Sequence, residues 1–592
     1  MFSILYDGAA NEWLRFESPR QVIQAHCLAD VRPALCEIAR QTEKHRLCAA
    51  GFIGYEAAPA FDAALHAHAP GDFPLLCFGL YEPPHRFLTL QGASAYHLGQ
   101  WQPTVSHYTY GQAIDRVKEC IARGETYQVN YTFRLQAAFA GDPYGLFFAM
   151  QQAQPTPYAA YIDLGRYALC SASPELFFQR EAGTLTCRPM KGTAARGKTP
   201  AGDRRQAAWL HHSEKNRAEN VMIVDMIRND LGRIAATGSV RVTSLFETER
   251  YPSLWQMTST VTARSQAGLA DIFTALFPCA SITGAPKVST CRIINQLEKT
   301  PRRIYTGTIG FVTPQGKMQF NVAIRTALID RQRRQAEYGV GSGIVWDSTT
   351  SDEYEECLMK AKFVQTGRLE KAGQTTGEQG TSSATHPFSL FESLLWTPNE
   401  GYFLLTYHFK RMAESARYFG YPFDPHQAEA DLAKLAAGLP GEGHKVRLLL
   451  HPDGSFDSEA RTLSALHKPD PARVRLAPAP VHSGDVFLYH KTTNRQAYQV
   501  AEAACPDCDE VILWNERGEL TEAGTANIVL ALDGRLVTPP LSCGLLAGTF
   551  RAFLLEQKEI SEETLPVSSL ERCDQIYLIN SVRKWRKAIR LP

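Results

Sequence analysis

The stretch RPMKGTAARG, residues 188–197, places one lysine, Lys191, among glycine and arginine residues. Such a lysine is either a solvated surface residue or a nucleophile that points into a pocket. A nucleophilic amine has to be neutral, and a free lysine, whose pKa is about 10.4, is only roughly 0.1% neutral at about pH 7.4. Burial or a cationic neighbour would lower that pKa, and Arg188 and Arg196 are candidates that lie close in sequence.

Carboxylates recur on two segments that have helical character. NRAENVMIVDMIRNDLGR (216–233) carries Glu219 on a mostly apolar stretch, and DEYEECLMKAKF (352–363) carries Glu355 and Glu356. Two carboxylates from two helices, completed by water and substrate oxygens, are the kind of ligand set that Mg²⁺ prefers. The alternative is a solvated helical face on which Glu356 pairs with the lysine four residues later.

A glycine-rich stretch and a predicted strand could bind an anion. YGVGSGIVWDS (338–348) has three glycines whose backbone amides can point together at an anionic group, although a plain turn fits the same residues. SITGAPK (281–287) is either part of such a cradle or the cap of the helix that follows it. MQFNVAIRTALID (318–330) alternates like one strand, which puts Arg325 on the face opposite its apolar stripe.

Two helices are predicted beside these segments. TGAPKVSTCRIINQLEKTP (283–301) places Pro286 in the first turn, and its apolar side chains recur at helical spacing: Val288, Cys291, Ile294 and Leu297. TTSDEYEECLMKAKFVQ (349–365) is opened by Thr350 with Glu353 three residues later, which is a capping-box pattern.

A second set of chemistry-bearing residues lies in the C-terminal part of the chain. YHKTTNR (489–495), LTEAGTANIVL (520–530) and CGLLAGTFR (543–551) present a lysine, a glutamate and a Gly-Thr pair near a helix start. Together they suit pyridoxal phosphate: the lysine forms a Schiff base, the carboxylate keeps the pyridine nitrogen protonated, and a helix N-terminus holds the phosphate. Taken singly, they fit a surface lysine, a turn glutamate and a helix cap.

The composition restricts the class of protein. The chain has 592 residues, 44% hydrophobic and 21% charged, which is typical of a globular protein with several domains. Its formal net charge of +1 argues against nucleic-acid binding, which needs a basic face. No signal-peptide pattern and no apolar run long enough for a membrane span occur, so we expect no membrane association. The 14 cysteines lack a framework spacing, and we therefore expect reduced thiols and a cytoplasmic location.

One segment divides the chain. Residues 368–387, RLEKAGQTTGEQGTSSATHP, are rich in Gly, Ser, Thr and Gln and poor in large apolar side chains. Such a segment cannot bury enough surface to offset its chain entropy, so it is predicted to be a flexible linker. Two functional units are expected on either side of it, residues 1–367 and 388–592.

The order of motifs in the first unit resembles the chorismate-utilising enzymes. SASPELFF (171–178), RPMKGTAARG, the Glu219 segment, SITGAPK, YGVGSGIVWDS and DEYEECLMKAKF follow one another as they do in that family. The family includes anthranilate, isochorismate and salicylate synthases and aminodeoxychorismate synthase component I. The resemblance implies large antiparallel sheets flanked by helices. GETYQVNYTFR (124–134) agrees with the amine-transferring branch, because the isochorismate branch has a lysine base where this chain has Gln128.

The resemblance implies a role for each matching residue. Anthranilate synthases have a small residue where aminodeoxychorismate synthases have a lysine before Gly-Thr. Lys191 is therefore expected to attack C2 of chorismate while Glu175 protonates the departing C4 hydroxyl, and Glu219 and Glu356 match the Mg²⁺ ligands. Gln256 stands where many relatives have histidine, which leaves its role open. The residues expected at the substrate carboxylates and in the anion cradle are Tyr305, Arg325, Thr283, Gly284, Gly341, Ser342 and Gly343.

The second unit resembles the fold-type IV pyridoxal-phosphate enzymes, from FSLFESLLW (388–396) through IYLINSVRK (576–584). That family includes branched-chain and D-amino-acid aminotransferases and aminodeoxychorismate lyase, and it implies an α/β unit of two subdomains. Lys491 is then the Schiff-base lysine and proton shuttle, and Glu522 is the partner of the ring nitrogen. The residues expected at the phosphate are Arg411 of YHFKRM (407–412), Thr525 and Thr549.

These inferences combine into one expected function for a chain of mixed α/β (α+β) class. The first unit would convert chorismate and ammonia to 4-amino-4-deoxychorismate, and the second would eliminate pyruvate to give 4-aminobenzoate, a folate precursor. The alternatives are an anthranilate synthase-like first unit and a second unit that is an aminotransferase or a non-catalytic scaffold that binds the cofactor. No glutaminase motif is visible, so ammonia is expected from free ammonium or from a separate glutamine amidotransferase subunit. A homodimer is plausible because fold-type IV relatives commonly dimerise.

Overall fold

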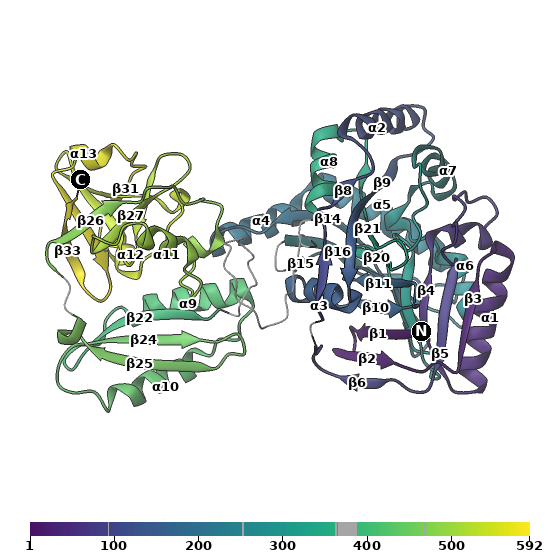
Figure 1. Ribbon diagram of the computed structural model, residues 1–592, viewed down its shortest axis with the longest axis horizontal. Helices are drawn as coiled ribbons and strands as arrows, with labels where there is room; N and C mark the ends of the chain where they lie inside the picture. The colour runs from purple at the N-terminus through teal and green to yellow at the C-terminus, as the bar shows by residue number, and fades with distance from the viewer. Residues whose placement is uncertain (93, 252–253, 362–363, 365–387, 467–468, 592) are drawn as a thin grey trace. The chain divides into compact units, whose positions relative to one another are not determined.

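The computed structural model describes the chain except for residues 93, 252–253, 362–363, 365–387, 467–468 and 592 (Figure 1). It forms two compact units, one of Met1–Ala194 with Ala207–Ser382 and one of Ala195–Gln206 with Ser383–Pro592. The predicted linker at 368–387 lies outside the described residues, so the domain boundaries stay a prediction. In the part of the chain that is described, no helix combines the length and the apolar character needed to cross a bilayer.

The first unit is built on two large sheets whose described pairings are antiparallel (Figure 1). Among the described residues one sheet contains β17 (Gly284–Ala285), β9 (Gln128–Gly141), β21 (Gln335–Ile344), β20 (Thr326–Asp330), β11 (Tyr167–Ser171), β10 (Ala160–Asp163), β1 (Phe2–Asp7), β2 (Glu12–Phe16) and β6 (His85–Phe87), with β7 (Tyr96–Leu98) and β8 (Gln102–Pro103) beside β9. The other contains β14 (Met190–Ala195), β16 (Leu254–Arg264), β13 (Thr184–Arg188), β12 (Leu176–Glu181), β19 (Met318–Asn321), β18 (Thr308–Val312), β4 (Cys48–Ile53), β5 (Leu76–Tyr81) and β3 (Gln21–Ala25), with β15 (Arg241–Arg250) beside β16.

The two sheets pack face to face, and helices cover their outer faces. Successive side chains of a strand point to opposite sides, so each buried strand serves two cores. In β4, Cys48, Ala50 and Phe52 face the core between the sheets, while Ala49 and Ile53 face the helices. The helices over the β4 sheet are α1 (Leu28–Lys44), α5 (Glu214–Gly232) and α6 (Leu269–Leu276). Those over the β9 sheet are α2 (His107–Ala122), α3 (Pro143–Ala153), α7 (Lys287–Leu297) and α8 (Thr350–Met359).

Three details of the predicted helices are wrong. The N-cap of α8 is Thr349, whose hydroxyl accepts the backbone N–H of Asp352, so the cap lies one residue before the predicted Thr350. In α7, Pro286 is the N-cap and precedes the first helical residue. Val288 of that helix is 43% exposed and is not part of the buried stripe.

The single strand predicted at 318–330 is also wrong. The segment forms β19 in one sheet and β20 in the other, and the chain crosses between the sheets at residues 322–325. Both halves are buried strands, so the alternation of side chains continues across the break and hides it. Arg325 lies at the crossing in left-handed backbone, with φ of 51°, rather than on the polar face of a strand.

The second unit has two sheets of different character. The smaller is antiparallel, with β23 (Gly401–Tyr402), β22 (Leu390–Thr397), β24 (His444–Leu450) and β25 (Phe456–Thr462), and it packs against α9 (Leu405–Phe419) and α10 (Pro425–Ala436). The larger is mixed, in the order β28 (Leu520–Ala523), β27 (Glu510–Trp514), β26 (Ala472–Leu476), β33 (Lys584–Arg590), β32 (Gln575–Asn580), β29 (Asn527–Leu532), β30 (Arg535–Thr538) and β31 (Ser561–Glu562). Its helices are α11 (Gln496–Ala503), α12 (Thr549–Glu556) and α13 (Ser569–Arg572), and α4 (Pro200–His212) has residues in both units.

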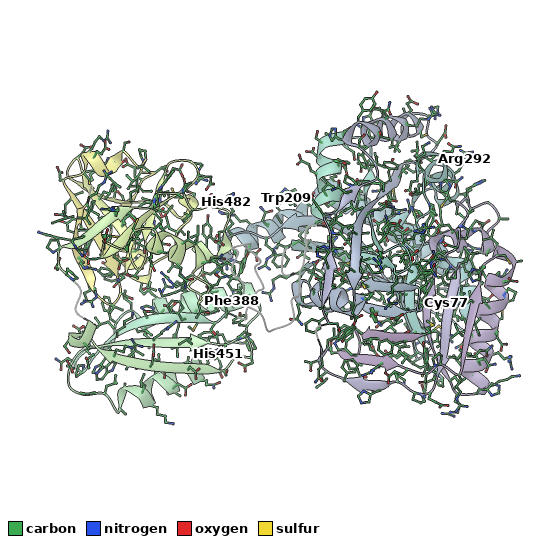
Figure 2. All side chains as sticks on the ribbon, viewed as in Figure 1. Cys77, Trp209, Arg292, Phe388, His451 and His482 are labelled. Carbon is green, nitrogen blue, oxygen red and sulfur yellow. The ribbon has the colours of Figure 1, made fainter. Side chains whose placement is uncertain are left out.

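All fourteen cysteines lie among the described residues, and each is a free thiol. Most are buried, such as Cys77 in the first unit (Figure 2). Burial raises the pKa of the Cys77 thiol to about 11, which keeps it protonated and unreactive.

Candidate active sites

Lys191 lies on β14 and is half-buried. Its Nζ donates a hydrogen bond to Oδ1 of Asn130 on β9, at 3.3 Å. Burial lowers the pKa of this amine, and the ammonium of Lys360 acts in the same direction. The carboxylates of Glu219, Glu175 and Glu356 oppose that shift. The net direction, toward a neutral amine, is the one that a nucleophile needs.

The cation beside Lys191 differs from the two candidates near it in sequence. Arg188 forms an ion pair with Glu249 at 2.6 Å, and Arg196 forms one with Asp203 at 2.7 Å. Lys360 occupies the neighbouring position instead and arrives from the end of α8. Residues far apart in sequence meet here, so proximity along the chain pointed to the wrong partners.

Glu175 is buried in the same place, with 3% of its surface exposed. Burial raises its pKa to about 7, and a hydrogen bond from Ser281 and the charge of Lys191 reduce the shift. Its Oε1 has no hydrogen-bond partner within the described structure. A carboxyl with this pKa carries a proton part of the time at neutral pH, as a general acid requires.

Glu219 on α5 and Glu356 on α8 interact electrostatically with each other and with Lys191. Burial and the neighbouring carboxylates raise the pKa of Glu219. Burial also disfavours the charged form of Glu356, but its ion pair with Lys360 at 2.7 Å holds the pKa below its ordinary value. The described residues contain no cluster of three or more His, Cys, Asp and Glu suited to a metal. Two converging carboxylates fit Mg²⁺, which keeps several ligands from water and substrate.

The backbone of β21 presents two amides toward the site. Asn130 and Thr132 of β9 lie opposite Gly343 and Gly341, and the Asn130 amide bonds to the Thr283 carbonyl rather than to β21. These are therefore pairs without mutual hydrogen bonds, in which the backbone groups of both strands point away from each other. The pairing of β20 with β21 ends at Tyr338, so the amides of Gly341 and Gly343 face no strand.

Ser342 and Thr283 do not fit the predicted anion cradle as well. Ser342 lies between these glycines, so its amide points into the ladder with β9, and its hydroxyl bonds to Tyr110 at 2.8 Å. The hydroxyl of Thr283 donates within its own turn, to the Cys279 carbonyl at 3.2 Å. Ser342 is therefore turned away from the site, and Thr283 supports the turn.

Glycine in β21 makes room for side chains above the strand. A Cβ at Gly339 would lie 2.0 Å from the Tyr305 ring, and one at Gly343 would lie 2.4 Å from Nε2 of Gln128. Gln128 is fully buried, and both of its amide atoms lack a partner among the described residues. Such an amide is costly to bury unless a ligand completes its hydrogen bonds.

Tyr305 and Arg325 lie at the same end of β21. The Tyr305 ring packs under the guanidinium of Arg134, at 5.2 Å, and burial raises its pKa to about 12, so its hydroxyl remains a donor. Burial lowers the pKa of Arg325, whose electrostatic neighbours are Tyr338 and Tyr251. A desolvated guanidinium of this kind suits a carboxylate ligand.

Gln256 holds the segment that follows Lys191. Its Nε2 donates to the Gly192 carbonyl at 2.9 Å, and its Oε1 accepts the Thr193 hydroxyl at 3.1 Å. The side chain spans from β16 to β14 and fixes the strand that carries the lysine.

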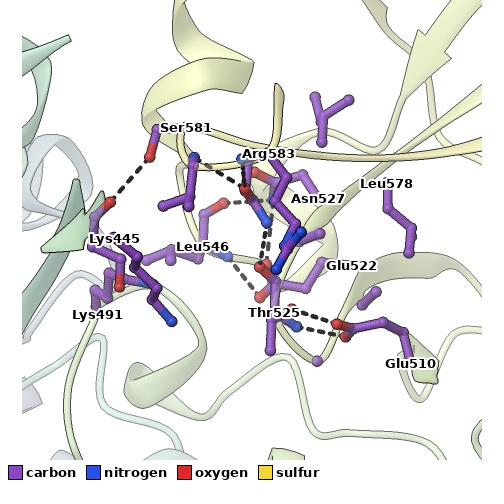
Figure 3. Close-up of a pocket in the computed structure, with 18 of the residues that line it drawn as sticks. Lys445, Lys491, Glu510, Glu522, Thr525, Asn527, Leu546, Leu578, Ser581 and Arg583 are labelled. Atoms are coloured by element: carbon purple, nitrogen blue, oxygen red, sulfur yellow. Dashed lines mark hydrogen bonds between the residues drawn. The ribbon is translucent and has the colours of Figure 1, made fainter. Parts of the chain in front are cut away.

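The second unit contains a cavity of about 680 Å³ into which Lys491 projects (Figure 3). Nζ of Lys491 lies 4.7 Å from the ring centre of Phe391 on β22. Burial lowers the pKa of this lysine to about 7, and Arg411 contributes in the same direction. Further cationic side chains also line the cavity: Lys445, Arg447, Arg461, Arg495, Arg583 and Arg586.

Glu522 on β28 lies in the same cavity and is almost fully buried. Its Oε1 accepts the Tyr498 hydroxyl at 2.7 Å. Oε1 also accepts the Leu546 amide at 3.0 Å, and Oε2 accepts Nδ2 of Asn527 at 3.2 Å (Figure 3). Burial raises its pKa to about 7. These bonds fix the carboxyl, and a protonated pyridine nitrogen would stabilise its charged form.

Arg411 on α9 is held by a carboxylate that the sequence patterns did not single out. Its Nε and Nη2 donate to Glu392 at 2.9 and 2.5 Å, and its Nη1 donates to the Ala547 carbonyl at 2.9 Å. Glu392 also accepts Nδ1 of His408 at 2.7 Å. Although burial opposes it, the charge of Arg411 brings the pKa of Glu392 down to about 2. The guanidinium keeps further N–H groups for a phosphate.

The two threonines predicted at the phosphate differ. Thr549 is the first residue of α12, and its hydroxyl lies 3.3 Å from Nε2 of His408. Because Nδ1 of the neutral imidazole donates to Glu392, Nε2 accepts this hydroxyl, and the amide at the helix start is left for an anion. Thr525 donates both its amide, at 3.0 Å, and its hydroxyl, at 2.5 Å, to Glu510 (Figure 3). A phosphate beside Thr525 would have to displace that carboxylate.

Sequence patterns left several of these residues unassigned. Asn130, Glu392 and His408 stood inside quoted motifs without a role, and Lys360 was expected only as the helical partner of Glu356. Glu392 gave a signal, because it interrupts an otherwise apolar strand on the same face as Leu390 and Leu394. A charged residue at such a position has to be paired.

Residues 90–366 match the model of the chorismate binding enzyme family, and residues 389–590 match that of amino-transferase class IV. The chain carries a chorismate-binding enzyme domain and a class IV amino-transferase domain. The second domain implies pyridoxal phosphate as its cofactor. Both assignments agree with the resemblances seen in the sequence motifs.

Individual relatives match the first domain. The chain is 40% identical over 286 residues to aminodeoxychorismate synthase component 1 of Salmonella typhimurium, which covers 47% of this chain and 63% of that protein. It is 37% identical over 264 residues to anthranilate synthase component 1 of Aquifex aeolicus, which covers 44% and 53%. The structure of anthranilate synthase component I from Streptococcus pneumoniae shares the fold, with a TM-score of 0.53 at 23% identity over 62% of this chain and 92% of that chain. The chain spans 54% to 63% of the length of four aminodeoxychorismate synthase component 1 relatives that it matches.

Proposed function

We propose that the first unit converts chorismate and ammonia to 4-amino-4-deoxychorismate, and that the second unit eliminates pyruvate from this product to give 4-aminobenzoate. The observation that carries the first step is the pairing of Lys191 with Glu175. Burial lowers the pKa of the lysine and raises that of the glutamate to about 7, so one acts as nucleophile and the other as acid. Similarity to aminodeoxychorismate synthase component 1 supports the choice of substrate.

The first step replaces the C4 hydroxyl of chorismate by a bond to the enzyme. The lone pair of neutral Lys191 forms a bond to C2, the two ring double bonds shift, and the C4–O bond breaks. Glu175 gives its proton to the departing oxygen, which leaves as water. Both groups would have to reach one substrate, and their mutual electrostatic interaction supports such proximity.

The second step restores the lysine. The lone pair of ammonia forms a bond to C4, the double bonds shift back, and the C2–N bond breaks with its electron pair returning to Lys191. The new C4 ammonium gives one proton to the Glu175 carboxylate, which is ready for the next cycle. Ammonia would come from a separate glutamine amidotransferase subunit, as the component 1 names of the relatives suggest.

Glu219 and Glu356 would hold Mg²⁺, and its charge would bind the ring carboxylate of chorismate. Tyr305 and Arg325 would bind the enolpyruvyl carboxylate, and the free amides of Gly341 and Gly343 would accept an anionic oxygen. Each of these groups orients the ring so that C2 faces Lys191.

In the second unit, bound pyridoxal phosphate supplies an electron sink at the carbon that carries the amine. Lys491, whose pKa burial lowers to about 7, would take the proton from C4 of the substrate. Glu522 would hold the pyridine nitrogen, while Arg411 and the amide of Thr549 would bind the phosphate. Loss of the C4 proton and of the C3 oxygen releases pyruvate and leaves an aromatic ring. The cationic lining of the cavity suits a substrate with two carboxylates.

A product analysis tests both assignments. Purified full-length protein is given chorismate, Mg²⁺ and ammonium, with and without pyridoxal phosphate, and the products are identified by chromatography and mass spectrometry. We expect 4-aminobenzoate and pyruvate when the cofactor is present. Anthranilate would refute the role of Lys191, and aminodeoxychorismate that accumulates with bound cofactor would assign the second unit to amino transfer or to scaffolding.

A further inference from the structure

Asn130 is the one residue that hydrogen-bonds to the side chain of Lys191 among the described residues, and its own backbone is held by two further bonds. Its amide donates to the Thr283 carbonyl at 2.8 Å, and its carbonyl accepts Nη2 of Arg302 at 2.8 Å. Neither bond involves the Asn130 side chain. The position of the side chain is therefore set by the strand and not by the lysine that it contacts.

A buried ion pair holds this part of β9. Arg302 is 1% exposed and bonds to Glu298 at 2.6 and 3.0 Å. Its Nη1 donates to the Ile282 carbonyl at 3.0 Å, next to Thr283. Glu298 in turn accepts the amide and the hydroxyl of Thr132, at 3.0 and 2.8 Å. The pair thus ties the strand to the turn before α7, and it fixes the point from which Asn130 reaches the site.

The side chain of Asn130 faces the space in which a ligand would lie. Its Oδ1 accepts Nζ of Lys191, while its Nδ2 is buried and has no partner within the described structure. Gly343 lies opposite on β21, where a Cβ would come within 3.3 Å of Oδ1. Glycine at that position keeps the amide able to turn toward the lysine.

We propose that Asn130 is a positioning residue for the amine-transfer step, and that it aims the Lys191 amine at the substrate by accepting one of its N–H bonds. A neutral amine has one lone pair, and fixing one N–H bond fixes the direction of that pair. Orientation of this kind raises the rate because the lone pair of the amine already points at the carbon that it attacks. The proposal rests on the amine-transfer function of the first unit.

The type of residue matters as much as its place. The charged groups that face Lys191 are Glu219 from α5, Glu175 before β12, and Glu356 and Lys360 from α8. Three of the four are carboxylates, which favour the protonated amine. An amide oxygen holds the amine without adding a further negative charge. An aspartate of the same shape would hold it as well but would favour the ammonium, which has no lone pair to donate.

The test compares Asn130→Asp and Asn130→Ala in the full-length protein. Competitive labelling of lysines with acetic anhydride over a pH series, read by peptide mass spectrometry, gives the pKa of Lys191, with Lys287 as an internal reference. Turnover of chorismate is measured on the same preparations at constant free ammonia. Asn295→Asp is the matched control, because it adds a carboxylate on α7, and Asn295 also has a buried amide oxygen without a partner in the described structure.

In Asn130→Asp we expect the pKa of Lys191 to rise by about one to three units, and turnover at neutral pH to fall at least about tenfold below that of wild type. In Asn130→Ala we expect kcat to fall about tenfold or more while KM for chorismate changes little. The Lys191 amine is no longer oriented in this variant, whereas the groups that bind chorismate are unchanged. A Lys191 titration that is unchanged in Asn130→Asp, or an unchanged kcat in Asn130→Ala, overturns the proposal. Wild-type protein that makes neither aminodeoxychorismate nor 4-aminobenzoate refutes the proposed function instead, since the labelling result does not depend on turnover.

Discussion

Replacing Glu392 by glutamine should destabilise the second unit and weaken its binding of cofactor. The carboxylate is 1% exposed and joins Arg411 to His408 in a buried network. Glutamine keeps the shape of the side chain but removes the charge, and its amide nitrogen would face the guanidinium. Arg411 would then be a buried cation without a counterion, and it would no longer be aimed at the phosphate.

The size of the effect follows from the pKa of Glu392. A fall from 4.5 to about 2 on folding corresponds to roughly 3 kcal/mol of stability. Breaking a buried ion pair by removing one partner costs roughly 3–5 kcal/mol, which is of the same order. For a unit of this size, about 2–4 °C of melting temperature is lost for each kcal/mol, so we expect a decrease of about 6–12 °C.

Scanning calorimetry of the full-length protein measures this decrease in the transition that shifts upward when pyridoxal phosphate is added. The folded-state pKa lies below the ordinary value, so the carboxylate contributes its full stability above about pH 4.5 and loses it as pH falls toward about 2. The difference between wild type and Glu392→Gln should therefore be present at neutral pH and shrink in acid. A titration with the cofactor, followed by its visible absorbance, gives the affinity.

Glu510→Gln is the matched control, because Glu510 is also buried beside the cavity but holds the neutral Thr525. It should lower the melting temperature by much less. A Glu392→Gln protein that melts within about 2 °C of wild type and binds the cofactor equally well would show that Arg411 does not depend on this carboxylate.

Three further outcomes are expected. Lys491→Ala should leave aminodeoxychorismate to accumulate from chorismate and ammonium, and 4-aminobenzoate formed at the wild-type rate would exclude Lys491 as the proton carrier. Glu175 has to be protonated to act as an acid, so with its pKa of about 7 the first step should slow as pH rises above that value. The Glu175→Gln variant should be about 10²–10⁴-fold slower and should lack this alkaline decline, and a pH series of chorismate consumption measures both effects. Glu219→Gln should require at least about tenfold more Mg²⁺ for half-maximal activity, whereas an unchanged requirement, measured by titrating a chelated preparation, would remove Glu219 from the metal site.

The sequence predicted the families of its two parts, which the family models confirm, better than it predicted local geometry. Lys191, Glu175, Lys491 and Glu522 were singled out because they match motifs of the two families, and their roles stay predictions. The break between β19 and β20 was missed because both strands are buried, and the alternation of their side chains looks the same before and after the break. Arg325 was therefore placed on a strand face, whereas it lies at a crossing.

Contacts between distant segments account for the other errors. Lys360 acts on Lys191 from the end of α8, and no local pattern shows that these two cations approach each other. Ser342 looked equivalent to its glycine neighbours, but strand pairing turns alternate amides in opposite directions. Glu392 was the exception, since a charge in an apolar strand already required a partner.

The ion pair of Arg302 and Glu298 grips main-chain atoms of β9 and leaves the side chains at 128 and 130 untouched. The main chain of the strand is therefore held by contacts that do not depend on which side chains it carries at these two positions. Neither side chain takes part in the contacts between the ion pair and the strand, so a substitution at 128 or 130 removes none of those contacts. Substitutions at these two positions would thus change the groups that face the substrate while the contacts that hold the main chain of the strand are kept.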